Sequence, residues 1–246
     1  MSQKELTIRI CNVLSYISVL EISRLHLPSF GYDSSLRPVP IFMQFLWWAT
    51  SVLLGGFVIY QWFPTALTAL EAVAWWYVIA SLILAIFLKF MHVAWSSHFT
   101  LLVVTGLCIT IFQAYKRVHL LNLESYSDKL FVRAAFSLFY TWSVIESVVL
   151  AVSVFEYTLP QAWQIFNVAG AITIAVMSWG SVKFFNDYIA WSVLIGSLVM
   201  AWLKEHDIII SWSLLGCAII ALLIVGWPKL RREWVRRQDI GAPLLV

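Results

Sequence analysis

One carboxylic acid lies deep inside an otherwise apolar run of the chain. Glu146 is near the centre of residues 134–155, where an ionised carboxylate would cost at least about 2.5 kcal/mol if the run crosses a bilayer. Trp142 and Phe139 precede it at spacings that place all three side chains on one helix face. An aromatic wall beside a buried acid predicts a ligand cavity. The alternative is that Glu146 is protonated and bonds a nearby serine or a neighbouring helix as part of the packing.

Tryptophan is unusually abundant, with 14 in 246 residues. Indole rings near helix ends anchor at the membrane interface. Rings at mid-depth offer flat walls and one N–H donor, which suits stacking on a planar ligand. Trp47, Trp48 and Trp142 fall closest to the middle of apolar runs. We therefore expect an aromatic site within the bundle, although packing or anchoring is the ordinary role of any single tryptophan.

The histidines do not follow a haem-binding pattern. His92 and His98 flank one predicted turn, and His119 lies just beyond the next apolar run, on the opposite side of the membrane. A transmembrane bis-histidyl haem needs two histidines at mid-depth on facing helices, so we expect these three at the interfaces. The sequence contains no GxSxG, HExxH, Walker or GxGxxG pattern. It therefore indicates no catalytic residue and no metal site, and an enzyme is not expected.

Long apolar runs place these residues in a membrane. Hydrophobic residues make up 61% and charged residues 12% of the chain, whereas soluble domains are about 25% charged. A spanning helix needs about 20 apolar residues. We predict an all-α polytopic membrane bundle with clear spans at residues 42–63, 72–88, 99–115, 134–155, 162–182, 188–203 and 208–227. A further run, residues 6–20, contains Arg9 and Asn12, and is either a span or an interfacial amphipathic helix.

The distribution of basic residues predicts how this bundle of about eight spans is oriented in the membrane. With the N-terminus on the cytoplasmic side, most of the 16 Lys and Arg residues fall on that side, as they do in membrane proteins generally. Both termini are then predicted to be cytoplasmic, with a basic tail at residues 229–246 that meets anionic head groups. The net charge of +3 is small and is not gathered in an aromatic-studded patch. Nucleic acid is therefore not expected as a partner, whereas the lipid bilayer is.

Several short aromatic motifs resemble the TspO/MBR family, the tryptophan-rich sensory proteins that include the translocator protein. Residues 38–64 read PVPIFMQFLWWATSVLLGGFVIYQWFP, in which Trp47 and the FVIYQ at residues 57–61 keep the family's spacing. Three other segments resemble the family: MHVAW at 91–95, AFSLFYTW at 135–142, and NVLSYI at 12–17, which is similar to a longer subset with extra C-terminal helices. The resemblance covers about residues 12–155.

The chain departs from the family's motifs at polar positions. His92 stands where asparagine is usual, Ala135 replaces a proline, Phe139 a tyrosine and Leu150 an asparagine. Those positions help to shape the family's ligand cavity. The ligand preference of this chain therefore need not follow the family's.

The resemblance implies a five-helix core, residues 1–157, that binds a planar hydrophobic ligand and tends to dimerise. Trp47, Trp95 and Trp142 match its cavity walls, and the residue types add Phe139, Glu146 and His92 as ligand-binding candidates. Residues 158–228 would supply three additional helices. No resident cofactor is assigned, since a porphyrin or haem would be the ligand.

The function that this implies is a membrane receptor or carrier for a tetrapyrrole or a sterol-like molecule, in tetrapyrrole sensing, transport or breakdown. Two alternatives remain open. Sparse polar residues would also suit a non-catalytic accessory subunit of a larger membrane complex. A small-solute transporter that uses Glu146 is the other.

Overall fold

The computed structural model describes residues 2–25, 36–90, 97–121, 123 and 125–223, and within these ranges the chain is helical without a strand. The principal helices are α1 (Gln3–Leu25), α2 (Pro40–Tyr60), α3 (Leu67–Val73), α4 (Trp76–Phe90), α5 (Ser97–Leu120), α6 (Tyr126–Asp128), α7 (Ala135–Thr158), α8 (Trp163–Phe185), α9 (Tyr188–Lys204) and a last helix, Ile208–Leu223. A π-helical turn, η2 (Lys129–Ala134), joins α6 to α7.

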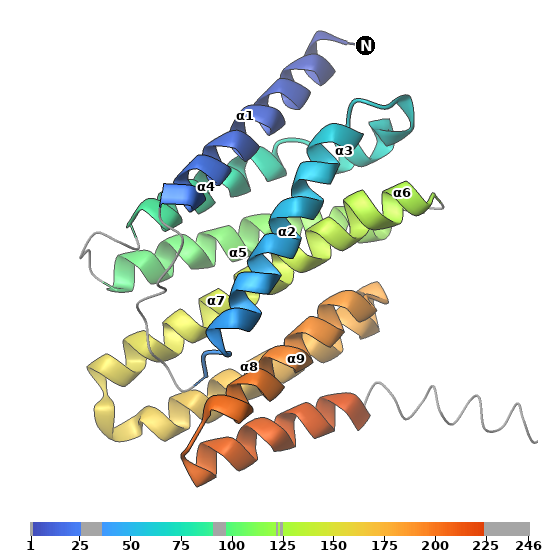
Figure 1. Ribbon diagram of the computed structural model, residues 1–246. Helices are drawn as coiled ribbons and strands as arrows, with labels where there is room; N and C mark the ends of the chain where they lie inside the picture. Colours follow the sequence, from blue (N-terminus) through green and yellow to red (C-terminus); the bar gives the residue numbers. More distant parts are fainter. Residues whose placement is uncertain (1, 26–35, 91–96, 122, 124, 224–246) are drawn as a thin grey trace, which may run out of the picture.

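Most of the helices lie side by side in a row. Figure 1 shows α1, α4, α5, α7 and the α8–α9 hairpin following one another down the molecule, with α2 crossing in front of α5 and α7. Helix α7 is the centre of this arrangement, because it contacts α2, α5, α8 and α9. Its side chains are buried on nearly every side from Ala135 to Glu146.

Among the described residues, five helical segments are long and apolar enough to cross a membrane: Gln3–Arg24, Pro40–Tyr60, His98–Leu120, Tyr126–Thr158 and Pro160–Phe185. A sixth arises if Pro64–Val73 and Trp76–Lys89 form one span, although they are bent by 62° at a break where Ala74 has a φ of 44°. Helix α9 and Ile208–Leu223 are shorter apolar helices. An all-helical chain with several apolar helices of spanning length is therefore confirmed. The number of about eight spans, the side of the termini and the domain limits stay predictions.

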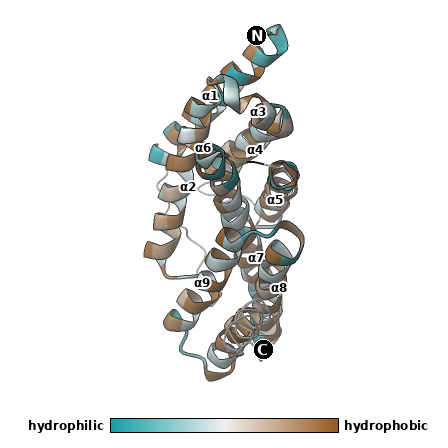
Figure 2. Cartoon of the chain, turned by 90° about the vertical axis from the view of Figure 1, so that its right-hand side faces the viewer, coloured by the Kyte–Doolittle hydropathy of each residue, from teal (hydrophilic) through white to brown (hydrophobic). Residues whose placement is uncertain are grey.

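The outward helix faces are apolar, as a lipid environment requires. Figure 2 shows hydrophobic residues along most of the helices and polar ones at α6 and at the N-terminal end of α1. Large side chains such as Ile41, Phe45 and Leu102 are more than two-thirds exposed. Because a bilayer solvates such groups as well as a protein core does, their exposure fits membrane-facing positions.

Local signals explain where several helices begin and end. Pro40 opens α2, where its fixed φ suits the first turn and its missing N–H is not needed. Asn186 takes a left-handed conformation, with φ of 52°, and ends α8. The next residue, Asp187, caps α9 by accepting from the backbone N–H groups of Ile189 and Ala190 at 3.0 and 3.1 Å.

Candidate ligand-binding site

Three aromatic rings from three helices meet at Trp142. The Trp142 side chain, on α7, is fully buried. Its ring centroid lies 4.9 Å from that of Trp47 on α2, with the two planes tilted by 50°, and 6.3 Å from Phe87 on α4, which it meets edge to face at 78°. The structure thus brings two predicted wall residues together, in direct contact with each other.

The two neighbouring tryptophans of α2 point in opposite directions. Trp47 is 5% exposed, whereas Trp48 is 52% exposed and belongs to an outward face. Consecutive residues on a helix are about 100° apart, so only one of the pair can face α7. The sequence placed both near mid-span, and the structure assigns the interior position to Trp47.

Glu146 lies one turn after Trp142 and is also buried, at 5% exposure. Its Oε1 and the Nε1 of Trp142 both lack a hydrogen-bond partner among the described residues. The guanidinium of Arg37, which is itself 6% exposed and precedes α2, is close enough to act electrostatically on Glu146. Buried polar atoms without partners are uncommon in native structures and point to a function. Here a donor and an acceptor lie beside an aromatic surface.

The remaining predicted site residues divide into two groups. Phe139 is fully buried within the hydrophobic core on α7. His92 and Trp95 lie outside the described residues. Within those residues, the structure therefore collects Trp47, Trp142 and Glu146 into one cluster around α7, with Phe139 in the adjoining core.

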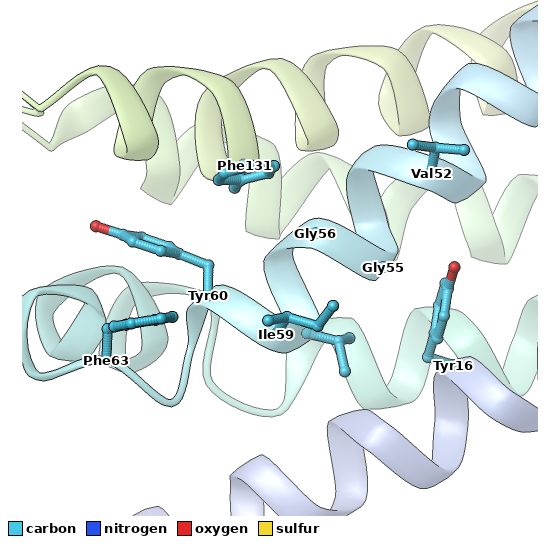
Figure 3. Close-up of a pocket in the computed structure, with 9 residues that line it drawn as sticks. Tyr16, Val52, Gly55, Gly56, Ile59, Tyr60, Phe63 and Phe131 are labelled. Atoms are coloured by element: carbon cyan, nitrogen blue, oxygen red, sulfur yellow. The ribbon is translucent and has the colours of Figure 1, made fainter.

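A pocket lies elsewhere, against α2 (Figure 3). Its volume is about 590 Å³, and its mostly apolar lining consists of Tyr16, Val52, Gly55, Gly56, Val58, Ile59, Tyr60, Phe63 and Phe131. That volume falls within the range of about 300–1,000 Å³ typical of small-molecule sites. None of the residues predicted from the sequence lines it.

Two adjacent glycines shape this pocket. A Cβ at Gly55 would lie 2.5 Å from the hydroxyl oxygen of Tyr16, and one at Gly56 would overlap the ring of Phe131. Figure 3 shows these two rings on different sides of the α2 backbone. The missing side chains therefore let α1 and η2 approach α2 closely. The Gly-Gly pair inside a long apolar run was a signal for such an approach, which the sequence reading did not use.

A second polar cluster fixes α1 to the end of α2. The side-chain amide of Asn12 donates to the Gln61 side-chain oxygen at 2.8 Å, and Gln61 donates to the backbone oxygen of Arg9 at 3.1 Å. The Arg9 guanidinium lies 5.7 Å from the centroid of the Trp62 ring, a cation–π geometry. Arg9 and Asn12, which make the run 6–20 polar in the sequence, thus face protein, and this explains how the run can contain them and still pack in the bundle.

A third cluster joins residues that the sequence did not connect. His119, in the last turn of α5, places Nε2 3.3 Å from Oδ2 of Asp187, and the two side chains are 1% and 2% exposed. Ser137 Oγ lies 3.4 Å from the same Nε2, and the rings of Tyr115 and Phe185 enclose the histidine. His119 was expected at an interface. The usable signals were the Tyr115–His119 spacing of one turn and the position of Asp187 just before an apolar run.

This third cluster is not a hydrolase triad. A Ser-His-Asp triad needs the serine on one ring nitrogen and the carboxylate on the other. Here both approach Nε2, while Nδ1 lies 3.0 Å from the backbone oxygen of Tyr115. Ser137 also donates its proton to the Arg133 carbonyl at 2.8 Å. Among the described residues no group of three or more His, Cys, Asp or Glu could hold a metal ion either.

The electrostatics of Asp187 favour its charged form. Burial raises the pKa of this carboxyl, but the nearby His119 and Ser137 side chains and the backbone N–H of Ala190 lower it by more, and the resulting pKa is below the ordinary value. Asp187 is therefore a buried carboxylate that its surroundings stabilise.

Comparison with known proteins adds no identification. No protein-family model matches the chain, and neither a curated protein nor a solved structure is significantly similar to it.

Proposed function

We propose that this chain is a membrane receptor or carrier of the TspO/MBR type that binds a planar hydrophobic ligand, of tetrapyrrole or sterol-like class, at the buried cluster around Trp142. The observation that carries the proposal is the pairing of an aromatic surface with two unpartnered polar atoms. Trp142 Nε1 and Glu146 Oε1 supply one donor and one acceptor beside the rings of Trp47 and Trp142.

The chemistry of this cluster favours a tetrapyrrole over a sterol. A tetrapyrrole has wide π faces that stack on indole, and its ring nitrogens and carboxylates provide both donors and acceptors. A sterol has a saturated ring system with a single hydroxyl, which would satisfy one of the two atoms. Arg37 adds a basic side chain that acts electrostatically on Glu146.

Ligand entry requires the rings to part. Trp47 and Trp142 are in contact, with centroids 4.9 Å apart, whereas a ligand stacked between two rings needs about twice the ordinary stacking distance. Trp47 lies on α2, and the pocket at Gly55 and Gly56 lies against the same helix. A displacement of α2 would therefore open the Trp47–Trp142 contact.

The test is a titration of the purified full chain, in detergent or nanodiscs, with protoporphyrin IX, a sterol and a long-chain fatty acid as probes. We expect saturable quenching of tryptophan fluorescence by protoporphyrin IX, and weaker or absent saturation with the other two. Equal, non-saturating partition of all three probes would contradict the proposal.

The close ring contact supports one alternative, a non-catalytic subunit of a larger membrane complex, in which Trp47, Phe87 and Trp142 serve as packing. Gentle extraction from the native membrane and size analysis separate the two. A receptor runs as a small oligomer of this chain, whereas an accessory subunit co-migrates with other proteins.

A further inference from the structure

His119 and Asp187 connect parts of the chain that the sequence separates widely. His119 ends α5 and lies next to α7, while Asp187 stands in the short link between α8 and α9. The contact therefore ties the α8–α9 hairpin to the helices of the predicted core. This observation is independent of any ligand at Trp142.

Both ring nitrogens of His119 face oxygen atoms that accept hydrogen bonds. Nδ1 lies 3.0 Å from the backbone oxygen of Tyr115, and Nε2 lies 3.3 Å from Oδ2 of Asp187. A neutral imidazole carries one N–H, so either neutral tautomer would set a lone pair against one of these oxygens. Only the imidazolium form presents an N–H to both oxygens, as a hydrogen bond at Nδ1 and as an ion pair with Asp187 at Nε2.

The helix ends stabilise the same pair of charges. His119 is in the last turn of α5, where a helix favours a positive charge. Asp187 is the N-cap of α9, where a helix favours a negative charge. One carboxylate oxygen of Asp187 accepts from the backbone of α9 and the other faces His119. The cap and the ion pair thus share one side chain.

We propose that His119 and Asp187 form a proton-controlled clamp, which holds the α8–α9 hairpin against α5 and α7 when His119 is protonated and releases it when the proton leaves. Loss of the proton removes the counter-charge from a carboxylate that is almost fully buried, and an unpaired buried charge is strongly unfavourable. The first turn of α9, which Asp187 caps, is then the element that loosens.

The other groups around the pair do not change charge over the relevant range. They are Tyr115 on α5, which acts electrostatically on Asp187, Tyr140 on α7, which stacks on Tyr115 at 4.5 Å, and Arg133 in η2, which donates to the Leu121 carbonyl. From α8 the contact is the ring of Phe185, with Lys183 in the last turn of that helix. Tyrosine, arginine and lysine side chains ordinarily keep one charge state between about pH 5 and 8, whereas histidine does not.

Hydrogen exchange of the full chain in nanodiscs tests the clamp. The amides of Ile189 and Ala190, which donate to Asp187, report on the first turn of α9. After correction for intrinsic exchange, we expect their protection in the wild type to fall at least about tenfold from pH 5 to 8. In His119→Gln this fall in protection with pH should be absent. His98 is an exposed histidine at the start of the same helix, and His98→Gln should keep the fall.

A second variant protects the test against loss of folding. Asp187→Asn preserves a side-chain oxygen for the cap, because asparagine caps helices as well as aspartate does, but it removes the carboxylate charge. We expect its exchange at Ile189 and Ala190 to be independent of pH as well. A wild type without the fall, or a fall that persists in His119→Gln or in Asp187→Asn, would overturn the proposal.

Discussion

Trp142 and Glu146 stand one helical turn apart on the buried side of α7, and within the described part of the chain neither the indole N–H nor Oε1 of the carboxyl has a hydrogen-bond partner. The same turn is in ring contact with Trp47 on α2. Leaving a buried polar atom unpaired costs about 1–3 kcal/mol. If this region served packing alone, two such atoms would destabilise the fold. A ligand that hydrogen-bonds both atoms would offset that loss of stability.

The contribution of Glu146 to binding is the first prediction. Glu146→Gln keeps the shape of the side chain but cannot carry a charge, so a ligand that pairs with the Glu146 carboxylate loses a charge-assisted hydrogen bond worth about 1.5–3 kcal/mol. We expect the affinity for protoporphyrin IX to fall by about tenfold or more in fluorescence titrations. Glu71→Gln, which alters an exposed acid on α3, is the matched control and should bind as the wild type does. Equal affinities of all three proteins would remove Glu146 from the site.

The stability of the core depends on Trp142 far more than on Trp48. Trp142→Ala empties a fully buried position, which typically costs about 3–5 kcal/mol in a core. Trp48 is 52% exposed on an outward face, so Trp48→Ala should cost much less. Thermal unfolding of both variants in the same detergent measures the difference. Similar midpoints for the two would contradict the packing described for α7.

The paired glycines of α2 should not tolerate a methyl group. Gly56→Ala would force the Phe131 ring away from α2, and overpacking of this kind costs about 1–3 kcal/mol. Gly106→Ala on α5 is the control, since a Cβ there meets no atom within 4 Å, and alanine in a helix is otherwise favoured by about 0.5–1 kcal/mol. We expect a lower unfolding temperature for the first variant and an equal or higher one for the second. Partial recovery in Gly56→Ala combined with Phe131→Leu would locate the clash.

Asp187 should stabilise the fold in a pH-dependent manner. Because its pKa is lower in the folded chain than the ordinary value of 3.8, its contribution is present above that value and is lost as the pH falls through the lowered one. At pH 5, where the proposed clamp holds a protonated His119, Asp187→Asn should cost about 1.5–3 kcal/mol through the lost interaction with His119. Asp187→Ala should cost about 1 kcal/mol more, because it also removes the cap of α9.

Unfolding measured against pH checks both points. The wild type should lose stability on acidification below about pH 4, while Asp187→Asn should lose less over the same range. If the two variants were equally stable at pH 5, the cap would contribute nothing. If Asp187→Asn matched the wild type, the ion pair would contribute nothing.

Sequence patterns predicted the elements of this fold better than its contacts. Apolar runs located the helices because a bilayer demands them, and Pro40, Pro64 and Pro160 each stand at the first position of a helix or helical turn. The bend between α3 and α4 was not predicted, because no proline or glycine marks Ala74. The one-turn spacing of Trp142 and Glu146 correctly placed both inside the bundle. It could not reveal that the Trp47 ring fills the space beside them.

The pair of His119 and Asp187 shows the limit most clearly. Each residue looks ordinary alone. His119 is a histidine at the end of an apolar run, and Asp187 is an aspartate just before another apolar run, where it caps α9. Their contact depends on how α5, α7 and the α8–α9 hairpin pack, which a single sequence does not specify. The need for glycine at positions 55 and 56 likewise arises from the close contacts of Tyr16 and Phe131, which belong to two other segments.

The most direct test of ligand binding at the α7 cluster is an absorption titration of the purified chain with protoporphyrin IX, in the wild type and in the double variant Trp142→Phe/Glu146→Gln. Glu146→Gln keeps the size of the side chain and Trp142→Phe keeps an aromatic ring, while together they remove the unpartnered donor and the carboxyl group. We predict a saturable shift of the Soret band with one site per chain in the wild type, and its loss in the double variant with unchanged helical content by circular dichroism. A saturable shift of equal affinity in the double variant, or none in the wild type, would contradict the account.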